Sequence, residues 1–181
     1  MEQCIRIIVP GVPDRSDIVH VLEQSIRDAF AQEGLGHLTD EVQGIIEEKM
    51  AVYDMYLKDG GCGTRFLAAT HREHVIGVIS FGPRGPAIRE CAGAALADIG
   101  ELGTLYVLPD YQNQGVASAL IRALLEQLAA EGVEQFCLDS GFARAQQRWR
   151  RKFGAPYVTV PNYWGPGSAN MVWLCNVRDH I

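Results

Sequence analysis

Seven residues in the middle of the chain have the composition of an anion-binding turn. They are Gln112 to Ser118, reading QNQGVAS, and they lie between an apolar run and a long amphipathic pattern. Gly115 and Ala117 present no bulky side chain, so a large anion can approach the backbone there, and Gly115 can also take a positive φ. If a helix begins here, its first N–H groups have no intrahelical partner and lie at the positive end of the helix dipole. The segment therefore predicts a main-chain site for a phosphate-bearing ligand.

The sequence on either side of this turn supplies a strand and a helix. Upstream, Leu102 to Leu108 is an apolar, β-compatible run, and Pro109 ends it because proline has no N–H to donate. Downstream, apolar residues recur at three- and four-residue spacing, which predicts a helix packed by one face onto a sheet: Ala117, Leu120, Ile121, Leu124, Leu125 and Leu128. The alternative, in which Gly115 merely permits a tight turn between a strand and a helix, stays open.

The pattern Gln112-x-x-Gly115-x-Ala117 follows a strand reading LYVLP and opens an amphipathic helix. In that context it resembles the acetyl-CoA-binding motif of the GNAT (GCN5-related) N-acetyltransferases. The motif region covers Glu101 to Gly132, and the order of predicted elements matches the family over essentially the whole chain. The resemblance implies acetyl-CoA as acetyl donor and an amine of a small molecule or a peptide as acceptor. It also implies an α+β (α/β) fold, with a mixed, mostly antiparallel sheet of six or seven strands flanked by helices.

Carried over by position, the resemblance assigns two parts of the cofactor to two short segments. The pantetheine arm of family members lies along the fourth strand like an added strand, so its contacts fall on backbone groups of Leu105, Tyr106 and Val107. A backbone N–H near Val107 also suits the charge that develops on the thioester oxygen. The pyrophosphate falls on main-chain amides of the turn: Gln112, Asn113, Gln114, Gly115, Val116, Ala117 and Ser118.

Acetyl transfer requires a neutral amine, so a general base must take the amine proton. The family often uses a carboxylate on the fourth strand, and Glu101 stands at that place; Asp98 is a second candidate, and an ordinary solvated role for Glu101 stays open. The leaving thiolate must in turn be protonated. Many family members carry a Tyr for this purpose in a later helix, but Trp149 occupies the aligned position, and an indole N–H is not a useful acid. The candidates for the proton donor to the thiolate are therefore Tyr163 and water.

Composition and charge predict a globular protein with a single domain over residues 1–181. The formal net charge of −6 argues against nucleic-acid binding as the main task. The sequence contains no bilayer-spanning run and no secretory leader, which predicts a cytoplasmic protein without a membrane partner. Five scattered cysteines without zinc-site spacing predict structural thiols and no metal site: Cys4, Cys62, Cys91, Cys137 and Cys175. A homodimer stays open.

The rest of the chain reads as alternating strands and helices, and no element can be assigned to residues 82–98. Strands are predicted at 4–9, 65–70, 75–81, 135–138, 157–160 and 171–177, and helices at 18–31, about 39–58 and 144–153. Ser16 or Asp17 is expected to cap the first helix. The last helix carries the densest positive charge of the sequence, which either faces solvent or contacts a CoA phosphate: Arg144, Arg148, Arg150, Arg151 and Lys152.

Two functions of different class remain. The first is an acetyl-CoA-dependent N-acetyltransferase in which the amine attacks the thioester directly with general-base assistance. The second is a non-catalytic CoA-binding GNAT-like domain, acting as a sensor or interaction module, which the departure at Trp149 keeps open. In the family the acceptor is chosen by the first two helices and a late loop, here Ile18 to Lys58 and Pro161 to Asn170, and the sequence does not identify it.

Overall fold

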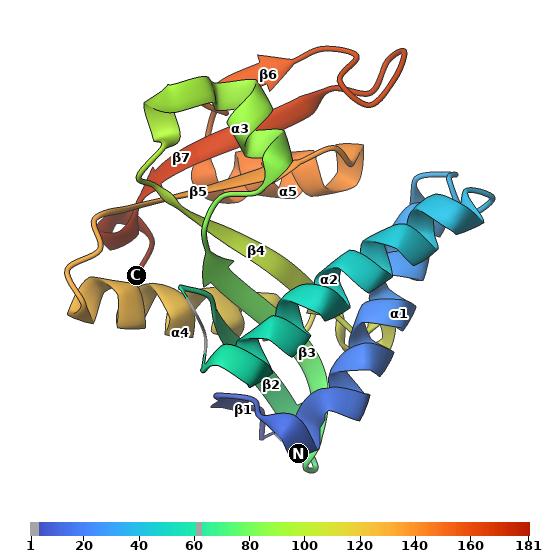
Figure 1. The fold of residues 1–181 in the computed structure, drawn as a ribbon, viewed down its shortest axis with the longest axis vertical. Helices are drawn as coiled ribbons and strands as arrows, with labels where there is room; N and C mark the ends of the chain where they lie inside the picture. Colours follow the sequence, from blue (N-terminus) through green and yellow to red (C-terminus); the bar gives the residue numbers. More distant parts are fainter. Residues whose placement is uncertain (1–3, 61–62) are drawn as a thin grey trace. The chain divides into compact units, whose positions relative to one another are not determined.

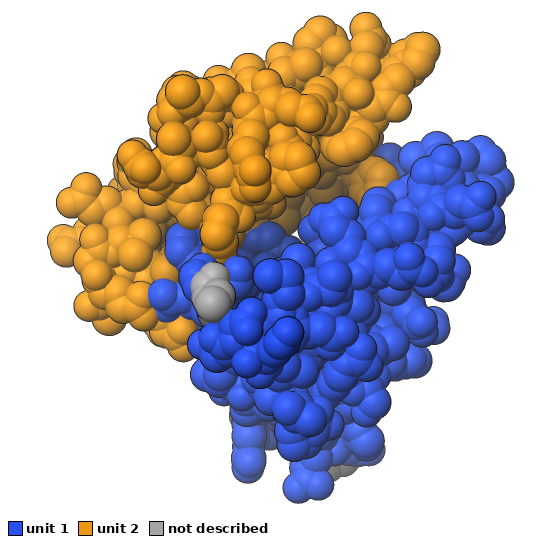
Figure 2. All heavy atoms as spheres, in the orientation of Figure 1, with its two compact units in different colours: residues 1–81, 103–124 blue, residues 82–102, 125–181 orange. Residues whose placement is uncertain are grey.

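The computed structural model describes residues 4–60 and 63–181, which form seven strands and five α-helices of an α+β fold. The chain divides into two compact units (Figure 2): unit 1 holds residues 1–81 and 103–124, and unit 2 holds residues 82–102 and 125–181. Strand β4 (Gly100–Val107) and helix α4 (Val116–Ala130) each contribute residues to both units. The single domain over residues 1–181 stays a prediction.

The strands form a seven-stranded mixed sheet in the order β1-β2-β3-β4-β5-β7-β6 (Figure 1). The pair β4–β5 is parallel, with Gly100 opposite Phe136 and Glu101 opposite Cys137, and the pairs β1–β2, β2–β3, β5–β7 and β6–β7 are antiparallel. This confirms the mixed, mostly antiparallel sheet. The other strands are β1 (Arg6–Ile8), β2 (Arg65–His71), β3 (His74–Gly82), β5 (Gln135–Ser140), β6 (Val158–Val160) and β7 (Asn170–Asn176).

In unit 1, helices α1 (Arg15–Gln32) and α2 (Thr39–Asp59) pack against each other (Figure 1). The helix predicted at 18–31 is confirmed, although it begins three residues earlier, and one face of it is buried: Ile18, Val21, Leu22, Ser25, Ile26 and Phe30. The strands predicted at 65–70 and 75–81 are also confirmed as β2 and β3, which pair as an antiparallel hairpin, and Arg72 and Glu73 both take a positive φ at its turn. Two left-handed residues give a turn whose twist matches that of the flanking strands.

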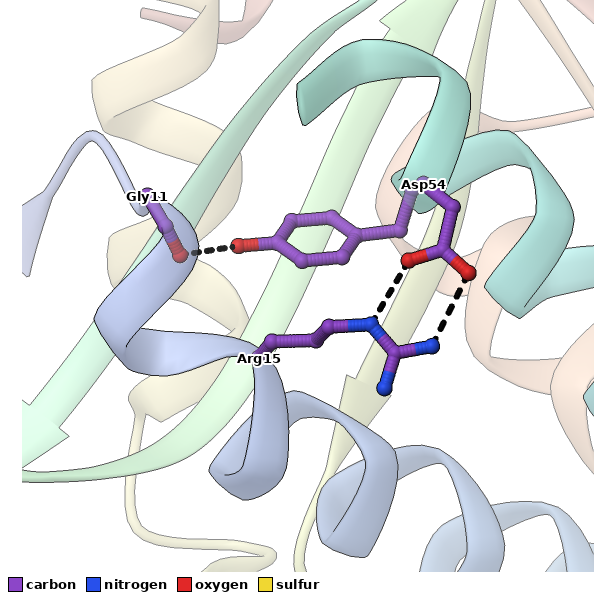
Figure 3. Close-up of polar contacts among 4 residues, drawn as sticks. Gly11, Arg15 and Asp54 are labelled. Atoms are coloured by element: carbon purple, nitrogen blue, oxygen red, sulfur yellow. Dashed lines mark hydrogen bonds and ion pairs between the residues drawn. The ribbon is translucent and has the colours of Figure 1, made fainter. Parts of the chain in front are cut away.

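Polar contacts fix the segment before α1 to α2. Tyr53 donates its hydroxyl to the Gly11 carbonyl at 2.9 Å, and Arg15 forms a two-pronged ion pair with Asp54 at 2.7 and 2.9 Å (Figure 3). Burial raises the pKa of the fully buried Tyr53, so this hydroxyl remains a protonated donor. The side chains of Arg15 and Asp54 are about half exposed, and solvent screening makes such a pair a minor contributor to stability. The buried tyrosine is therefore the stronger anchor.

The predicted capping of the first helix by Ser16 or Asp17 is wrong. The residue at the N-cap is Asp14, and a 3-10 turn, Val12–Asp14, precedes the helix. The Asp17 carboxylate instead accepts the main-chain N–H of Val75 at 3.0 Å. A contact across 58 residues thus takes the side chain that local sequence rules assign to the cap.

In unit 2, strands β5 and β7 are covered on both faces. Helix α3 (Pro86–Ala92) packs on β5, β6 and β7, and helix α5 (Ala143–Phe153) packs on β5 and β7. Alternate residues of a strand point to opposite faces. Cys137 and Val172 accordingly join Ile88 of α3 in one cluster, whereas the Phe136 ring contacts Phe153 of α5 with centroids 5.6 Å apart.

Helix α3 is the main element that sequence patterns did not reveal. It lies in the unassigned segment 82–98, where it begins with Pro86 after Gly85 and is followed by a 3-10 turn, Gly93–Leu96. Proline is favoured at the first position of a helix, and Ile88 and Leu96 are both buried. A single buried apolar residue in a seven-residue helix is too little to produce a periodic signal.

The cysteines differ in their surroundings. Cys137 and Cys175 are buried in strands as expected, and burial raises the pKa of each thiol to about 12. The strand predicted at 4–9 would include Cys4, and this part of the prediction is wrong. Strand β1 begins only at Arg6, and Cys4 is exposed. Cys91 is half-buried, and Cys62 lies outside the described residues. Within residues 4–60 and 63–181, no helix has the length and apolar composition that crossing a membrane requires.

Candidate functional site

Strand β4 is continuous but irregular at Thr104. This buried residue has a φ of +46°, which is a genuine outlier for a β-branched side chain. Burial alternates from Leu102 to Thr104 and then resumes one residue out of step, at Val107. A shift of this kind is typical of a β-bulge, in which an extra residue re-aims the groups that follow it. The backbone of Leu105 to Val107 is therefore presented differently from that of the first half of the strand.

The carbonyl of Val107 is a point of attachment for two other parts of unit 1. It accepts the Ser25 hydroxyl of α1 at 3.0 Å and the side-chain amide of Gln112 at 3.1 Å. Ser25 is only 4% exposed, so this bond is made away from water. A carbonyl oxygen has two lone pairs, and both are engaged here. A ligand that bonds to the Val107 carbonyl would therefore have to compete with one of these two bonds.

The turn Gln112 to Ser118, which we call the donor loop, leads from β4 into α4. Asn113 and Gly115 both have a positive φ, of +58° and +84°. Gln112 reaches back to Val107 and the side chain of Gln114 donates to the Asp110 carbonyl at 2.7 Å, so both glutamine side chains hold the loop in shape. The ladder of α4 begins with the bond from Ala119 N–H to Gly115 C=O at 2.9 Å.

This geometry suits an anion at the start of α4. The helix has 15 residues, and the amides of its first turn precede the hydrogen-bond ladder. The side chain of Val116 is buried and anchors the turn, while Asn113, Gln114, Gly115 and Ser118 are exposed. A Cβ atom built on Gly115 would meet no protein atom within 4 Å, so the space beside this residue is open. The loop therefore combines accessible main-chain donors with the positive end of a helix dipole.

Glu101 lies in unit 2, on the face of the sheet that α3 covers. Its register opposite Cys137 places the two side chains on the same face, and its charge is, after burial, the next cause of the raised pKa of the Cys137 thiol. The Glu101 carboxylate accepts the main-chain N–H of Gly85, at the start of α3. The side chain is half-buried. A carboxylate oriented in this way is suited to accept a proton from a ligand on that face.

Tyr163 also belongs to unit 2 and is attached to the same helix. Its hydroxyl donates to the Glu90 carboxylate, and this hydrogen bond is the main cause that raises the pKa of Tyr163 to about 12. A tyrosine with a raised pKa stays protonated across the neutral range and is a weaker acid. Trp149, at the position where the family often has an acidic Tyr, stacks on Phe153 with centroids 5.5 Å apart.

The predicted site residues fall into two groups according to the unit that holds them. Unit 1 holds Leu105 to Val107 and the donor loop, which are joined by the bond from Gln112 to Val107. Unit 2 holds Glu101 and Tyr163, and α3 contacts both, at Gly85 and at Glu90. The sequence patterns predicted neither α3 nor the irregularity at Thr104. The Gly85-Pro86 pair was the one local signal for α3.

The described residues contain no group of three or more His, Cys, Asp and Glu side chains that could hold a metal ion.

Comparisons with known proteins give one matching family model and several solved structures of similar fold. The model of the acetyltransferase (GNAT) family matches residues 25–155. A solved N-acetyltransferase from Staphylococcus aureus Mu50 is 17% identical, with a TM-score of 0.67, over 96% of this chain and 98% of that one. PaiA N-acetyltransferase from Thermoplasma acidophilum, solved with coenzyme A, is 13% identical, with a TM-score of 0.66, over 93% and 98%.

The ribosomal-protein-S18-alanine N-acetyltransferase from Escherichia coli is 15% identical, with a TM-score of 0.62, over 96% of this chain and 94% of that one. A search of curated proteins found no match. Since the family model covers well over half of the sequence, the chain belongs to the GNAT acetyltransferase family, whose acetyl donor is acetyl-CoA.

Replacement of Gly115 by Ala tests the donor loop. An L-residue at a φ of +84° is strained by about 1–2 kcal/mol, and its Cβ would enter the open space beside the loop. We expect the dissociation constant for acetyl-CoA, measured by calorimetry, to rise about tenfold. Gly132→Ala is the matched control, because Gly132 has a φ of +79° at the opposite end of α4, again with no atom within 4 Å of a built Cβ. Equal affinities in the two variants would remove the donor loop from the cofactor site.

Proposed function

We propose that this chain is an N-acetyltransferase that transfers the acetyl group of acetyl-CoA directly to an amine of a small molecule or a peptide. The observation that carries the proposal is the donor loop, whose two left-handed residues lead exposed amides into the N-terminus of a 15-residue helix. These amides suit the pyrophosphate of the cofactor. Main-chain groups of Leu105, Tyr106 and Val107 would contact the pantetheine arm.

The proposed reaction is a single displacement at the thioester. The amine nitrogen forms a bond to the carbonyl carbon, the bond from carbon to sulfur breaks, and CoA leaves as a thiolate. The N–H of Val107 is the proposed donor to the thioester oxygen, on which negative charge develops. Glu101 is the proposed general base that takes the proton of the attacking amine.

The thiolate takes its proton from Tyr163 or from water. The hydrogen bond to Glu90 raises the pKa of Tyr163 and makes it a weaker acid. Water is therefore the favoured proton donor to the thiolate. The position of Trp149, stacked on Phe153, supports the same choice, because no acidic hydroxyl stands there.

A non-catalytic, CoA-sensing role is the second candidate, and the departure at Trp149 is the observation that favours it. A direct assay separates the two functions. The protein is mixed with acetyl-CoA and a panel of amines that differ in charge and size, and free CoA thiol is followed over time. Our proposal predicts turnover with at least one amine. Binding of acetyl-CoA by calorimetry without thiol release on any amine would instead establish the sensor.

Glu101→Gln separates a base from a structural carboxylate. A glutamine keeps an oxygen that accepts the Gly85 N–H but cannot take a proton at neutral pH. We expect kcat/KM for the amine to fall about 100-fold at pH 7, and the loss to narrow as pH rises and the free amine predominates. Asp98→Asn is the control, because this exposed carboxylate is the other candidate base. A loss equal at every pH would assign Glu101 a structural role, and a pH-dependent loss in Asp98→Asn would make Asp98 the base.

A further inference from the structure

Trp164 is held in one orientation although most of its surface is exposed. It lies in the loop between β6 and β7 and is 58% exposed. Its indole N–H donates to Asn170 Oδ1 at 3.1 Å, and its main-chain N–H donates to the Ser168 carbonyl at 3.0 Å. The ring lies against Gly141, where a Cβ atom would come within 2.4 Å of Nε1. A tryptophan that serves only to fill a core would bury its ring, and this one does not.

Asn170 is the residue that fixes this tryptophan. It is fully buried at the start of β7, and its Nδ2 donates to Asp139 Oδ2 at 3.0 Å and to Cys91 Sγ at 3.5 Å. An indole N–H can only donate and a carboxylate can only accept, so these partners determine which way the Asn170 amide points. One buried amide therefore orients both Trp164 and Asp139.

The tryptophan stands beside the face of unit 2 that carries Glu101. Asp139 is two residues beyond Cys137 on β5, and Cys137 is opposite Glu101, so all three side chains share that face. The strand register thus places both carboxylates on the side of the sheet that holds the Cys137 thiol. After burial, the charges of Glu101 and then Asp139 raise the pKa of this thiol, and the weaker effect of Arg84 lowers it. The side-chain amide of Asn170 is bonded to both Asp139 and Trp164, so only this amide group separates the two side chains.

The surroundings of the indole favour a positive charge. The face of a tryptophan ring attracts an ammonium group placed within about 6 Å of its centre. The Tyr163 ring packs edge-on against Trp164 with centroids 4.7 Å apart, and its hydroxyl is bonded to the carboxylate of Glu90. An anionic group at this place would meet the charges of Asp139 and Glu90, whereas a cation would be attracted by both.

We propose that Trp164 is a specificity-determining residue that forms a wall of the acceptor site and binds a second positive charge of the amine acceptor. Asn170 is its positioning residue. This inference rests on the proposed function and names the acceptor class, which is a diamine or an amine that carries another cation. Asp139 lies two residues beyond Cys137, the residue opposite Glu101, and two residues of a strand span about 7 Å. Along the strand direction, Glu101 and Asp139 are therefore separated by roughly the length of a short aliphatic diamine.

The test compares two acceptors of equal length, 1,4-diaminobutane and 4-amino-1-butanol, which differ in the second charge. The variants are Trp164→Phe and Trp164→Leu, with Asn170→Ala for the positioning residue. Tyr157→Leu is the control, because Tyr157 is another exposed aromatic residue of unit 2. Values of KM and kcat are measured for each amine and for acetyl-CoA, and circular dichroism verifies that each variant is folded.

We expect the wild-type protein to prefer the diamine, as judged by kcat/KM. Trp164→Leu should reduce that preference about tenfold through the KM of the diamine, and Trp164→Phe should retain part of it because an aromatic face remains. Asn170→Ala should resemble Trp164→Leu, and the KM of acetyl-CoA should stay the same throughout. If Asn170→Ala does not fold, the two Trp164 variants decide the matter.

An unchanged preference in Trp164→Leu would overturn the inference, as would a wild-type protein that acetylates amines without preferring the diamine. Both results leave the proposed function intact. A wild-type protein that binds acetyl-CoA and acetylates no amine overturns the proposed function, and the inference with it.

Discussion

Strand β4 is irregular at Thr104, a buried, β-branched residue in a left-handed conformation. The strand carries residues of the proposed site before and after this residue. Before Thr104, the strand pairs in parallel with β5 and carries Glu101. After it, the strand carries Leu105 to Val107 and runs into the donor loop. Conformations of this kind cost on the order of 1–3 kcal/mol and persist only where the surroundings impose them. Three residues further along the strand, the bonds from Ser25 and Gln112 hold the Val107 carbonyl in place.

In unit 2, the short helix α3 has a comparable organising role. Gly85, the residue just before α3, donates its N–H to the Glu101 carboxylate. Glu90, within α3, accepts the hydroxyl of Tyr163. Its apolar side is held by Ile88, which packs with Cys137 and Val172. Both candidate catalytic side chains thus depend on a helix that is stable through tertiary packing rather than through its own sequence.

The parts of the protein that could be predicted from sequence are those with strong local signals. The strand, donor loop and helix between Glu101 and Gly132 combine an apolar run, a proline, a glycine and a regular helical period, and the structure contains each of them. The parts that could not be predicted depend on contacts between distant residues. Asp17 binds Val75 instead of capping its helix, and Tyr163 binds Glu90 across 73 residues, which changes its acidity. Spacing along a sequence contains no information on such partners.

We propose that main-chain amides of the donor loop hold the pyrophosphate of acetyl-CoA. Amide hydrogen exchange, followed by mass spectrometry with and without saturating acetyl-CoA, tests it most directly, because a bound phosphate protects the amides that it contacts. We expect slower exchange in peptides covering residues 112–119, together with residues 105–107 of β4. Unchanged exchange over residues 112–119 in the presence of bound acetyl-CoA would contradict it.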